Sequence, residues 1–201
     1  LQTEVRLVAE DAAGNEAERA FIDRFFPKTF KSDTIVLSET FLNKVVPEIL
    51  EQTPDFKDRG NLLDNYLAIN REMRQKNAEV IKSLARESAQ ELLWDTSFMT
   101  MRNGKVMAGF ADRRSYLYQG REIDQQTHLG YDLAVTKLAP IPAFNRGVVV
   151  YAGYLGIYGN AVVIDHGYGL QSIYAHLSSI GVMQGQKVAR GAIIGNTGET
   201  G

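Results

Sequence analysis

The side chains that could bind a metal or move a proton are gathered in one half of this 201-residue sequence. All three histidines, His128, His166 and His176, lie in the second half. The sequence has no cysteine, so a bound transition metal would have to use His, Asp and Glu side chains. A single histidine is more often structural than a ligand. Spacing and neighbouring residues therefore decide which of the three could do chemistry.

His128 stands four residues before Asp132, which pairs an imidazole with a carboxylate. Both groups are zinc ligands. In a regular strand these side chains would share a face but stand about 13 Å apart, too far to bind one ion. Gly130 lies between them and supplies the backbone freedom for a bend. The sequence therefore predicts a bent segment in which His128 and Asp132 bind the same metal ion.

The other two histidines belong to a predicted β-hairpin, with its turn at residues 167–169. Tyr174 and His176 have the same parity on the second strand. Both side chains are therefore expected on one face, with His176 pointing into a cleft beside the metal pair. His166 sits at the turn, where a structural hydrogen-bonding role is favoured over ligation.

The elements that carry these residues are predicted to be β-strands. After residue 100 lie 16 of the 18 glycines, and the segments between them are β-branched or aromatic. This pattern is typical of short antiparallel strands joined by tight turns. Strands are expected to include residues 148–151, 161–164 and 173–175.

The middle of the sequence has a helical pattern. Ser38 can cap a helix that Pro47 interrupts, and a second short helix is expected to end near Thr53. Asn61 can cap a longer helix, with apolar residues at spacings of three, four or seven, expected to run to about Leu93. These helices could form a lid over a cleft, or their amphipathic stripe could pack against the rest of the fold without a further role. The second interpretation is favoured.

The first 26 residues predict a β-hairpin with its turn at residues 11–15. It resembles the closing strands of a bacterial immunoglobulin-like domain, and an ordinary hairpin of the main fold is the alternative. The expected fold class is therefore α+β. A hairpin segment is expected over 1–35, a helical segment over 36–100 and an all-β, glycine-rich antiparallel domain over 101–201.

Composition limits the classes of partner. The formal net charge of -2 gives no overall attraction to nucleic acid or to an anionic membrane surface. No apolar stretch approaches the roughly 18 to 20 residues of a membrane span. The sequence begins at Leu1 without a basic-then-apolar leader, so an export signal or an anchor is expected upstream.

Four motifs, in order, resemble the core of the lysostaphin-type, LytM-like zinc metallopeptidases. The resemblance covers about residues 104–201 and implies a duplicated-hybrid-motif-like β fold. It implies that His128 and Asp132 are two of three Zn²⁺ ligands and that His176 is a catalytic residue near the attacked carbonyl. The motifs are His128-Leu-Gly-Tyr-Asp132, Gly-Asn-Ala-Val-Val-Ile-Asp-His-Gly (159–167), Tyr-Ala-His-Leu-Ser (174–178) and the glycine-punctuated run 185–195.

In this family the third ligand and a further catalytic histidine form a His-x-His pair shortly after a Gly-x-Thr-Gly segment. Such segments stand here at 195–198 and 198–201, and the sequence given stops at Gly201. We expect the parent protein to continue into the pair rather than to be a degenerate relative. Residues 1–201 alone are expected to be inactive, because two ligands hold zinc poorly.

The resemblance implies a zinc-dependent endopeptidase that hydrolyses peptide cross-links of bacterial peptidoglycan, in the periplasm or outside the cell. The alternative is a non-catalytic LytM-like regulator that binds and activates other cell-wall hydrolases, and a purely structural envelope protein is a third option. Arg113, Arg114 and Tyr116 could line a groove for an acidic peptide, although a solvated loop is the commoner explanation of such a cluster.

Overall fold

The computed structural model describes residues 5–22, 28–136 and 138–201. The chain forms two compact units, Leu1–Lys31 and Ser32–Gly201. Among the described residues, no helix combines the length and the apolar character needed to cross a membrane.

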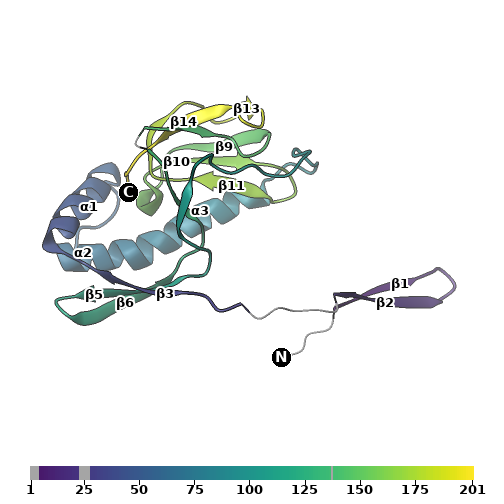
Figure 1. Ribbon diagram of the computed structural model, residues 1–201, viewed down its shortest axis with the longest axis horizontal. Coiled ribbons are helices and arrows are strands. Elements are labelled where there is room, and N and C mark those ends of the chain that lie inside the picture. Colours follow the sequence, from purple (N-terminus) through teal and green to yellow (C-terminus); the bar gives the residue numbers. More distant parts are fainter. Residues whose placement is uncertain (1–4, 23–27, 137) are drawn as a thin grey trace. The chain divides into compact units, whose positions relative to one another are not determined.

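The first unit contains the predicted hairpin, which is confirmed. Strands β1 (Val5–Glu10) and β2 (Glu16–Ile22) pair in antiparallel register (Figure 1). The carboxylate of Asp11 closes the turn, because it accepts hydrogen bonds from the backbone N–H groups of Ala13 and Asn15 and from the Asn15 side chain. These bonds, the one from the Asn15 side chain first, lower the pKa of Asp11.

The helical part of the second unit contains α1 (Glu39–Gln52), α2 (Leu62–Ala68), a π-helical turn η1 (Ile69–Met73) and α3 (Arg74–Arg86). Both predicted N-caps are present. Ser38 Oγ accepts from Phe41 N at 3.1 Å, and Asn61 Oδ1 accepts from Asp64 N at 2.9 Å.

Two predicted helix boundaries are wrong. Pro47 lies inside α1 and does not divide it. Val46 and Ile49 on either side of Pro47 are buried, and their burial offsets the hydrogen bond that a proline removes. The long helical stretch ends at Arg86 and not near Leu93, because the next residues bind a distant strand through Asp165.

The β part consists of short strands in four sheets, whose pairs are antiparallel except for β3 with β5. The β3 strand, immediately before α1, was not predicted. The strands are β3 (Ser32–Val36), β4 (Lys105–Ala108), β5 (Arg113–Tyr118), β6 (Arg121–Thr127), β7 (Asp132–Ala134), β8 (Pro140–Pro142), β9 (Gly147–Tyr154), β10 (Asn160–Asp165), β11 (Gln171–Tyr174), β12 (Leu177–Ile180), β13 (Lys187–Val188) and β14 (Ile193–Thr197), with a 3₁₀ turn η2 (Gly156–Tyr158) after β9.

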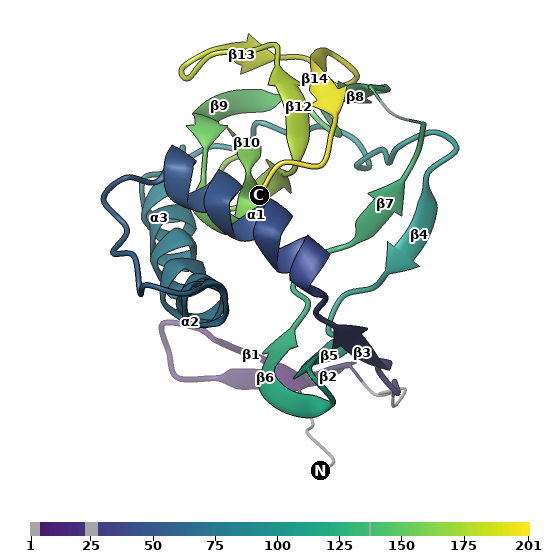
Figure 2. The same cartoon turned by 90° about the vertical axis from the view of Figure 1, so that its left-hand side faces the viewer.

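The sheet orders are β11-β10-β9-β13, β12-β14-β8, β3-β5-β6 and β4-β7. Figure 2 shows β4 beside β7, and α1 and α3 on the side of the unit where β9 and β10 lie. The predicted strands at residues 148–151, 161–164 and 173–175 fall on β9, β10 and β11, with Ala175 just past the end of β11. The expected α+β fold with a glycine-rich antiparallel part is thus confirmed.

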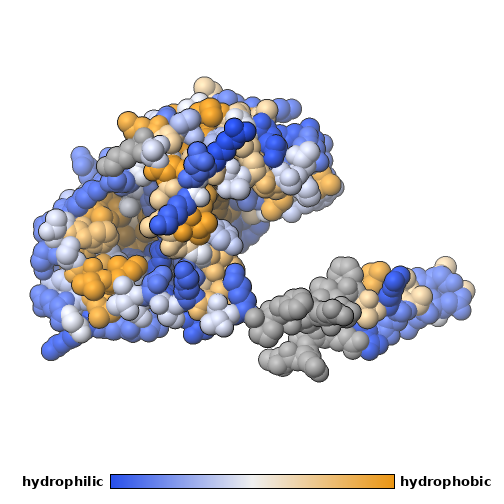
Figure 3. All heavy atoms as spheres, in the orientation of Figure 1, coloured by the Kyte–Doolittle hydropathy of each residue, from blue (hydrophilic) through white to orange (hydrophobic). Residues whose placement is uncertain are grey.

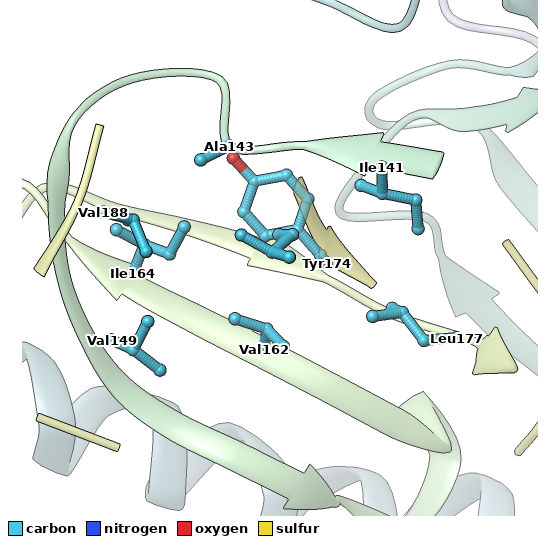
Figure 4. Packing of buried hydrophobic residues seen from close by; sticks show 9 residues of the cluster. Ile141, Ala143, Val149, Val162, Ile164, Tyr174, Leu177 and Val188 are labelled. Atoms are coloured by element: carbon cyan, nitrogen blue, oxygen red, sulfur yellow. The ribbon is translucent and has the colours of Figure 1, made fainter. Parts of the chain in front are cut away.

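Two clusters of buried hydrophobic side chains hold the second unit together. One lies between the β11-β10-β9-β13 and β12-β14-β8 sheets and includes Val162, Ile164, Tyr174 and Leu177 (Figure 4). The other joins the helices to β5 through Leu42, Val46, Ile49, Tyr66, Ile69, Met73 and Tyr116. The helices therefore pack through an amphipathic stripe, as the favoured interpretation expected.

Candidate metal and catalytic site

His128 and Asp132 meet across a bend between two strands. His128 follows the end of β6 and Asp132 begins β7, with Gly130 in the irregular segment between them. The two side chains face each other, with His128 Nε2 3.0 Å from Asp132 Oδ1. The predicted bend thus brings the imidazole and the carboxylate together.

A tight loop before β5 fixes the orientation of the His128 ring. His128 Nδ1 lies 2.9 Å from the backbone oxygen of Gly109, and because a carbonyl can only accept, Nδ1 carries the proton. The main chain of His128 also exchanges hydrogen bonds with Asp112 and Ala111, at 2.9 and 2.7 Å. The buried carboxylate of Asp112 closes this loop by accepting from Gly109 N at 2.7 Å.

Arg114 holds the other oxygen of the Asp132 carboxylate. Its Nη2 lies 2.6 Å from Asp132 Oδ2, while Oδ1 faces His128. The Arg114 side chain is 20% exposed and that of Asp132 is 46% exposed, so the pair lies at the edge of the solvent. Arg114 therefore directs one carboxylate oxygen toward the imidazole.

The pair fits a divalent metal ion. When the His128 ring is neutral, its one proton lies on Nδ1 and the lone pair of Nε2 faces Asp132 Oδ1 at 3.0 Å, so that two acceptors face each other. A cation between them removes this conflict. Two ligand atoms at ~2.1 Å from a tetrahedral zinc ion stand about 3.4 Å apart, close to the separation here. Backbone carbonyls that orient a ligating imidazole are also usual partners in metal sites.

Among the described residues, no group of three His, Cys, Asp or Glu side chains could hold a metal ion. Within the described ranges, His128 and Asp132 therefore bring together two candidate metal-binding side chains and no third. Figure 3 shows hydrophobic and hydrophilic residues side by side on the face that it draws. Large apolar side chains in the segments 107–110 and 129–131, next to the pair, are exposed. They are Met107, Phe110, Leu129 and Tyr131.

His176 lies between β11 and β12 and has its own set of contacts. Its φ of 58° is in the left-handed region, and its backbone N–H donates to Tyr158 O at 2.8 Å. Its ring is exposed, and Nδ1 lies 2.6 Å from Thr200 O. Nδ1 therefore donates to this carbonyl, and Nε2 makes no hydrogen bond to the residues that the structure describes.

The predicted shared face of Tyr174 and His176 is wrong. Tyr174 is 6% exposed and belongs to the core, whereas His176 is exposed. The left-handed backbone at His176 ends the alternation of side chains after β11, so parity does not carry from Tyr174 to His176.

His166 has the structural role that the sequence favoured. It is fully buried, and a continuous chain of hydrogen bonds passes through it. Phe144 N donates to the Tyr174 hydroxyl at 2.6 Å, and Ser172 Oγ lies 3.1 Å from this hydroxyl and 2.8 Å from His166 Nε2. His166 Nδ1 donates to Arg146 O at 2.7 Å. Burial, partly opposed by the bond to Arg146 and by the Asp165 charge, lowers the pKa of His166.

Arg113, Arg114 and Tyr116 do not form a solvated loop. All three lie on strand β5, where Arg113 is exposed, Arg114 binds Asp132 and Tyr116 is buried in the helical core. The role of Arg114 and that of the Gly109–Asp112 loop were missed. The pattern Gly-x-x-Asp at 109–112 is typical of a tight turn, but nothing local connects it with His128.

Comparisons with known proteins show what this part of the chain is similar to. Residues 126–201 match the model of peptidase family M23. The chain is 43% identical over 74 residues to DD-carboxypeptidase/endopeptidase Mpg of Neisseria meningitidis serogroup B, which is 37% of this chain and 17% of that protein. It is 31% identical over 144 residues to peptidoglycan DD-endopeptidase ShyA of Vibrio cholerae, which is 72% of this chain and 30% of ShyA.

Among solved structures, the chain is similar to the catalytic domain of the antimicrobial peptidase lysostaphin from Staphylococcus simulans. The TM-score is 0.41 and the identity 30%, with 50% of this chain and 72% of that chain covered.

The predicted resemblance to the lysostaphin-type, LytM-like peptidases is confirmed, because residues 126–201 match the family M23 model. His128, Asp132 and His176 all lie in this segment. The chain spans less than a third of the length of Mpg and of ShyA.

Proposed function

We propose that the protein carrying this chain is a zinc-dependent endopeptidase that hydrolyses peptide cross-links of bacterial peptidoglycan, in the periplasm or outside the cell. The proposal rests on one observation above all. His128 Nε2 and Asp132 Oδ1 face each other at 3.0 Å while their other polar atoms are bound by Gly109 and Arg114. The match of residues 126–201 to the model of peptidase family M23 supports it.

His128 and Asp132 would hold the metal ion, with a third donor supplied by the His-x-His pair that the family resemblance places after Gly201. Zinc bound there would act as a Lewis acid that polarises a peptide carbonyl and makes hydroxide available near neutral pH. Gly109 keeps the Nε2 lone pair of His128 directed at the ion. Arg114 keeps one oxygen of Asp132 directed the same way.

His176 is the proposed proton carrier. Its Nδ1 proton is held by Thr200 O, so the neutral ring presents an Nε2 lone pair that can accept a proton. Once protonated, Nε2 can donate a hydrogen bond to the oxygen on which negative charge develops. The exposed position of the ring leaves Nε2 accessible to a substrate peptide.

The test uses the natural protein that contains this chain, purified with its metal. Zinc content is measured by mass spectrometry, and cleavage is measured by the conversion of cross-linked to uncross-linked muropeptides. We expect His128→Ala and Asp132→Asn to lower both zinc content and cleavage at least about 100-fold, because each removes a metal ligand. Asp55→Asn is the matched control, since Asp55 is an exposed carboxylate on a helix-connecting turn.

The two measurements separate the alternatives. A protein that binds zinc through His128 and Asp132 but cleaves no cross-link would be a regulator, not an endopeptidase. A wild-type protein that binds no zinc, with His128→Ala behaving like Asp55→Asn, would refute the metal site itself.

A further inference from the structure

Thr200 is hydrogen-bonded to two segments of the chain, the start of β10 and the residue directly after His176. Its hydroxyl accepts a hydrogen bond from Asn160 N at 3.0 Å and donates one to Leu177 O at 2.9 Å. Asn160 begins β10, and Leu177 begins β12 directly after His176. The backbone oxygen of the same residue accepts from His176 Nδ1 at 2.6 Å. One residue therefore uses its side chain to hold its own position and its carbonyl to hold the imidazole.

The packing around Thr200 leaves it little freedom. A Cβ placed on Gly159 would stand 2.2 Å from Thr200 O and 2.4 Å from Thr200 Oγ1, and a Cβ on Gly201 would stand 2.3 Å from Gly159 N. Both glycines have positive φ, 57° and 88°. The chain at 200–201 thus lies directly against Gly159, at a distance that side chains there would prevent.

The His176 ring depends on this contact. It is exposed, and within the described part of the chain its side chain is hydrogen-bonded to the Thr200 carbonyl alone. A neutral imidazole in water exchanges between its two tautomers, whereas a bond from Nδ1 to a fixed carbonyl selects the form with a free Nε2. The left-handed backbone of His176 is held by the bond to Tyr158 O, one residue before Gly159.

We propose that Thr200 is a positioning residue for His176: its hydroxyl anchors a backbone carbonyl that fixes the tautomer and orientation of the imidazole. The inference rests on the proposed catalytic role of His176. Both hydrogen bonds of the Thr200 hydroxyl go to backbone atoms, so its effect on His176 acts through the carbonyl that holds the ring.

The experiment compares Thr200→Val, which keeps the shape and removes the hydroxyl, with Thr200→Ser, which keeps the hydroxyl. Thr197→Val is the matched control. The Thr197 hydroxyl also makes two backbone hydrogen bonds, accepting from Ala139 N at 2.9 Å and donating to Thr136 O at 3.1 Å, and neither reaches His176. Gly159→Ala is a second route, because its methyl group would displace Thr200.

The first measurement is the ¹⁵N chemical shifts of the His176 ring above its titration range, which report the tautomer directly and need no activity. We expect the Nδ1–H form in the wild type, in Thr200→Ser and in Thr197→Val, and a mixture of tautomers in Thr200→Val and Gly159→Ala. The second measurement is peptide cleavage by the natural protein against pH. Thr200→Val should lower kcat about 10-fold or more with KM changed less than about 2-fold, since proton transfer contributes factors of about 10² to 10⁴.

The outcomes are distinct. Unchanged ring shifts in both Thr200→Val and Gly159→Ala would overturn the inference. A drop in kcat that Thr197→Val shares equally would also overturn it, because the effect would then be one of stability. If the ring shifts change as expected but the wild-type protein cleaves nothing, the positioning of His176 stands and the proposed peptidase function fails.

Discussion

Replacing Asp165 by asparagine should detach the segment after α3 from the β-hairpin. Asp165 is 3% exposed. One carboxylate oxygen accepts from Ser88 Oγ at 2.6 Å and from Gly167 N at 3.1 Å, and the other accepts from Ala89 N at 2.9 Å. An amide of the same shape has only one oxygen, so its NH₂ group must face a donor on one side.

The less costly orientation keeps the bonds from Ser88 and Gly167 as neutral bonds and points NH₂ at Ala89 N. A hydrogen bond to a charged group contributes about 1.5–3 kcal/mol, and an unsatisfied buried donor costs about 1–3 kcal/mol. Counting the lost bond and the weakening of the other two, we expect Asp165→Asn to lower the free energy of unfolding by about 2–4 kcal/mol.

The assay is urea unfolding of the chain followed by circular dichroism, with Glu87→Gln as the control. Glu87 is an exposed carboxylate next to Ser88, and its change should stay within about 0.5 kcal/mol. Ser88→Ala removes one of the same bonds and leaves Gly169 N, which donates to Ser88 Oγ at 2.8 Å, without that acceptor. An Asp165→Asn variant whose free energy of unfolding lies within about 0.5 kcal/mol of the wild-type value would refute the reasoning. The three hydrogen bonds to the buried Asp165 carboxylate would then contribute little to stability.

Two further predictions concern the same hairpin. Since burial holds the pKa of His166 below its ordinary value of 6.5, protonation favours the unfolded chain. The contribution of neutral His166 to the free energy of unfolding is therefore fully present above about pH 6.5. It is lost as the pH drops toward the pKa of His166 in the folded chain. Urea unfolding at pH 7.5 and pH 5 should show this loss, and an equal loss in His166→Gln would contradict it. Gly167→Ala should destabilise the chain more than Gly185→Ala, as urea unfolding would measure. Both glycines have positive φ, but a Cβ on Gly167 would stand 1.8 Å from Glu91 O whereas one on Gly185 meets nothing within 4 Å. Gly185→Ala, the control, should lower the free energy of unfolding only by the cost of a left-handed backbone at an alanine, about 1–2 kcal/mol. Equal losses in the two variants would show that Glu91 moves aside freely.

The features that could be predicted from the sequence are those that neighbouring residues decide. Ser38 and Asn61 cap helices because a side-chain oxygen reaches a backbone N–H three residues on. The meeting of His128 with Asp132 is likewise local, since only three residues separate them and the chain bends between β6 and β7. The hairpin turn at 167–169 follows from glycines that accept positive φ.

Only the tertiary structure decided which distant residues bind and orient the side chains of the site. The Gly109 carbonyl and Arg114 reach the metal pair from 19 and 18 residues away, and Thr200 reaches His176 from 24 residues away. Pro47 stays helical, and the helical stretch ends at Arg86, because buried contacts outweigh local preference. Spacing along a sequence fixes which groups can approach one another through the backbone between them. The distant carbonyls and charges that orient those groups depend on the register of strands and the packing of the core, which no short segment specifies.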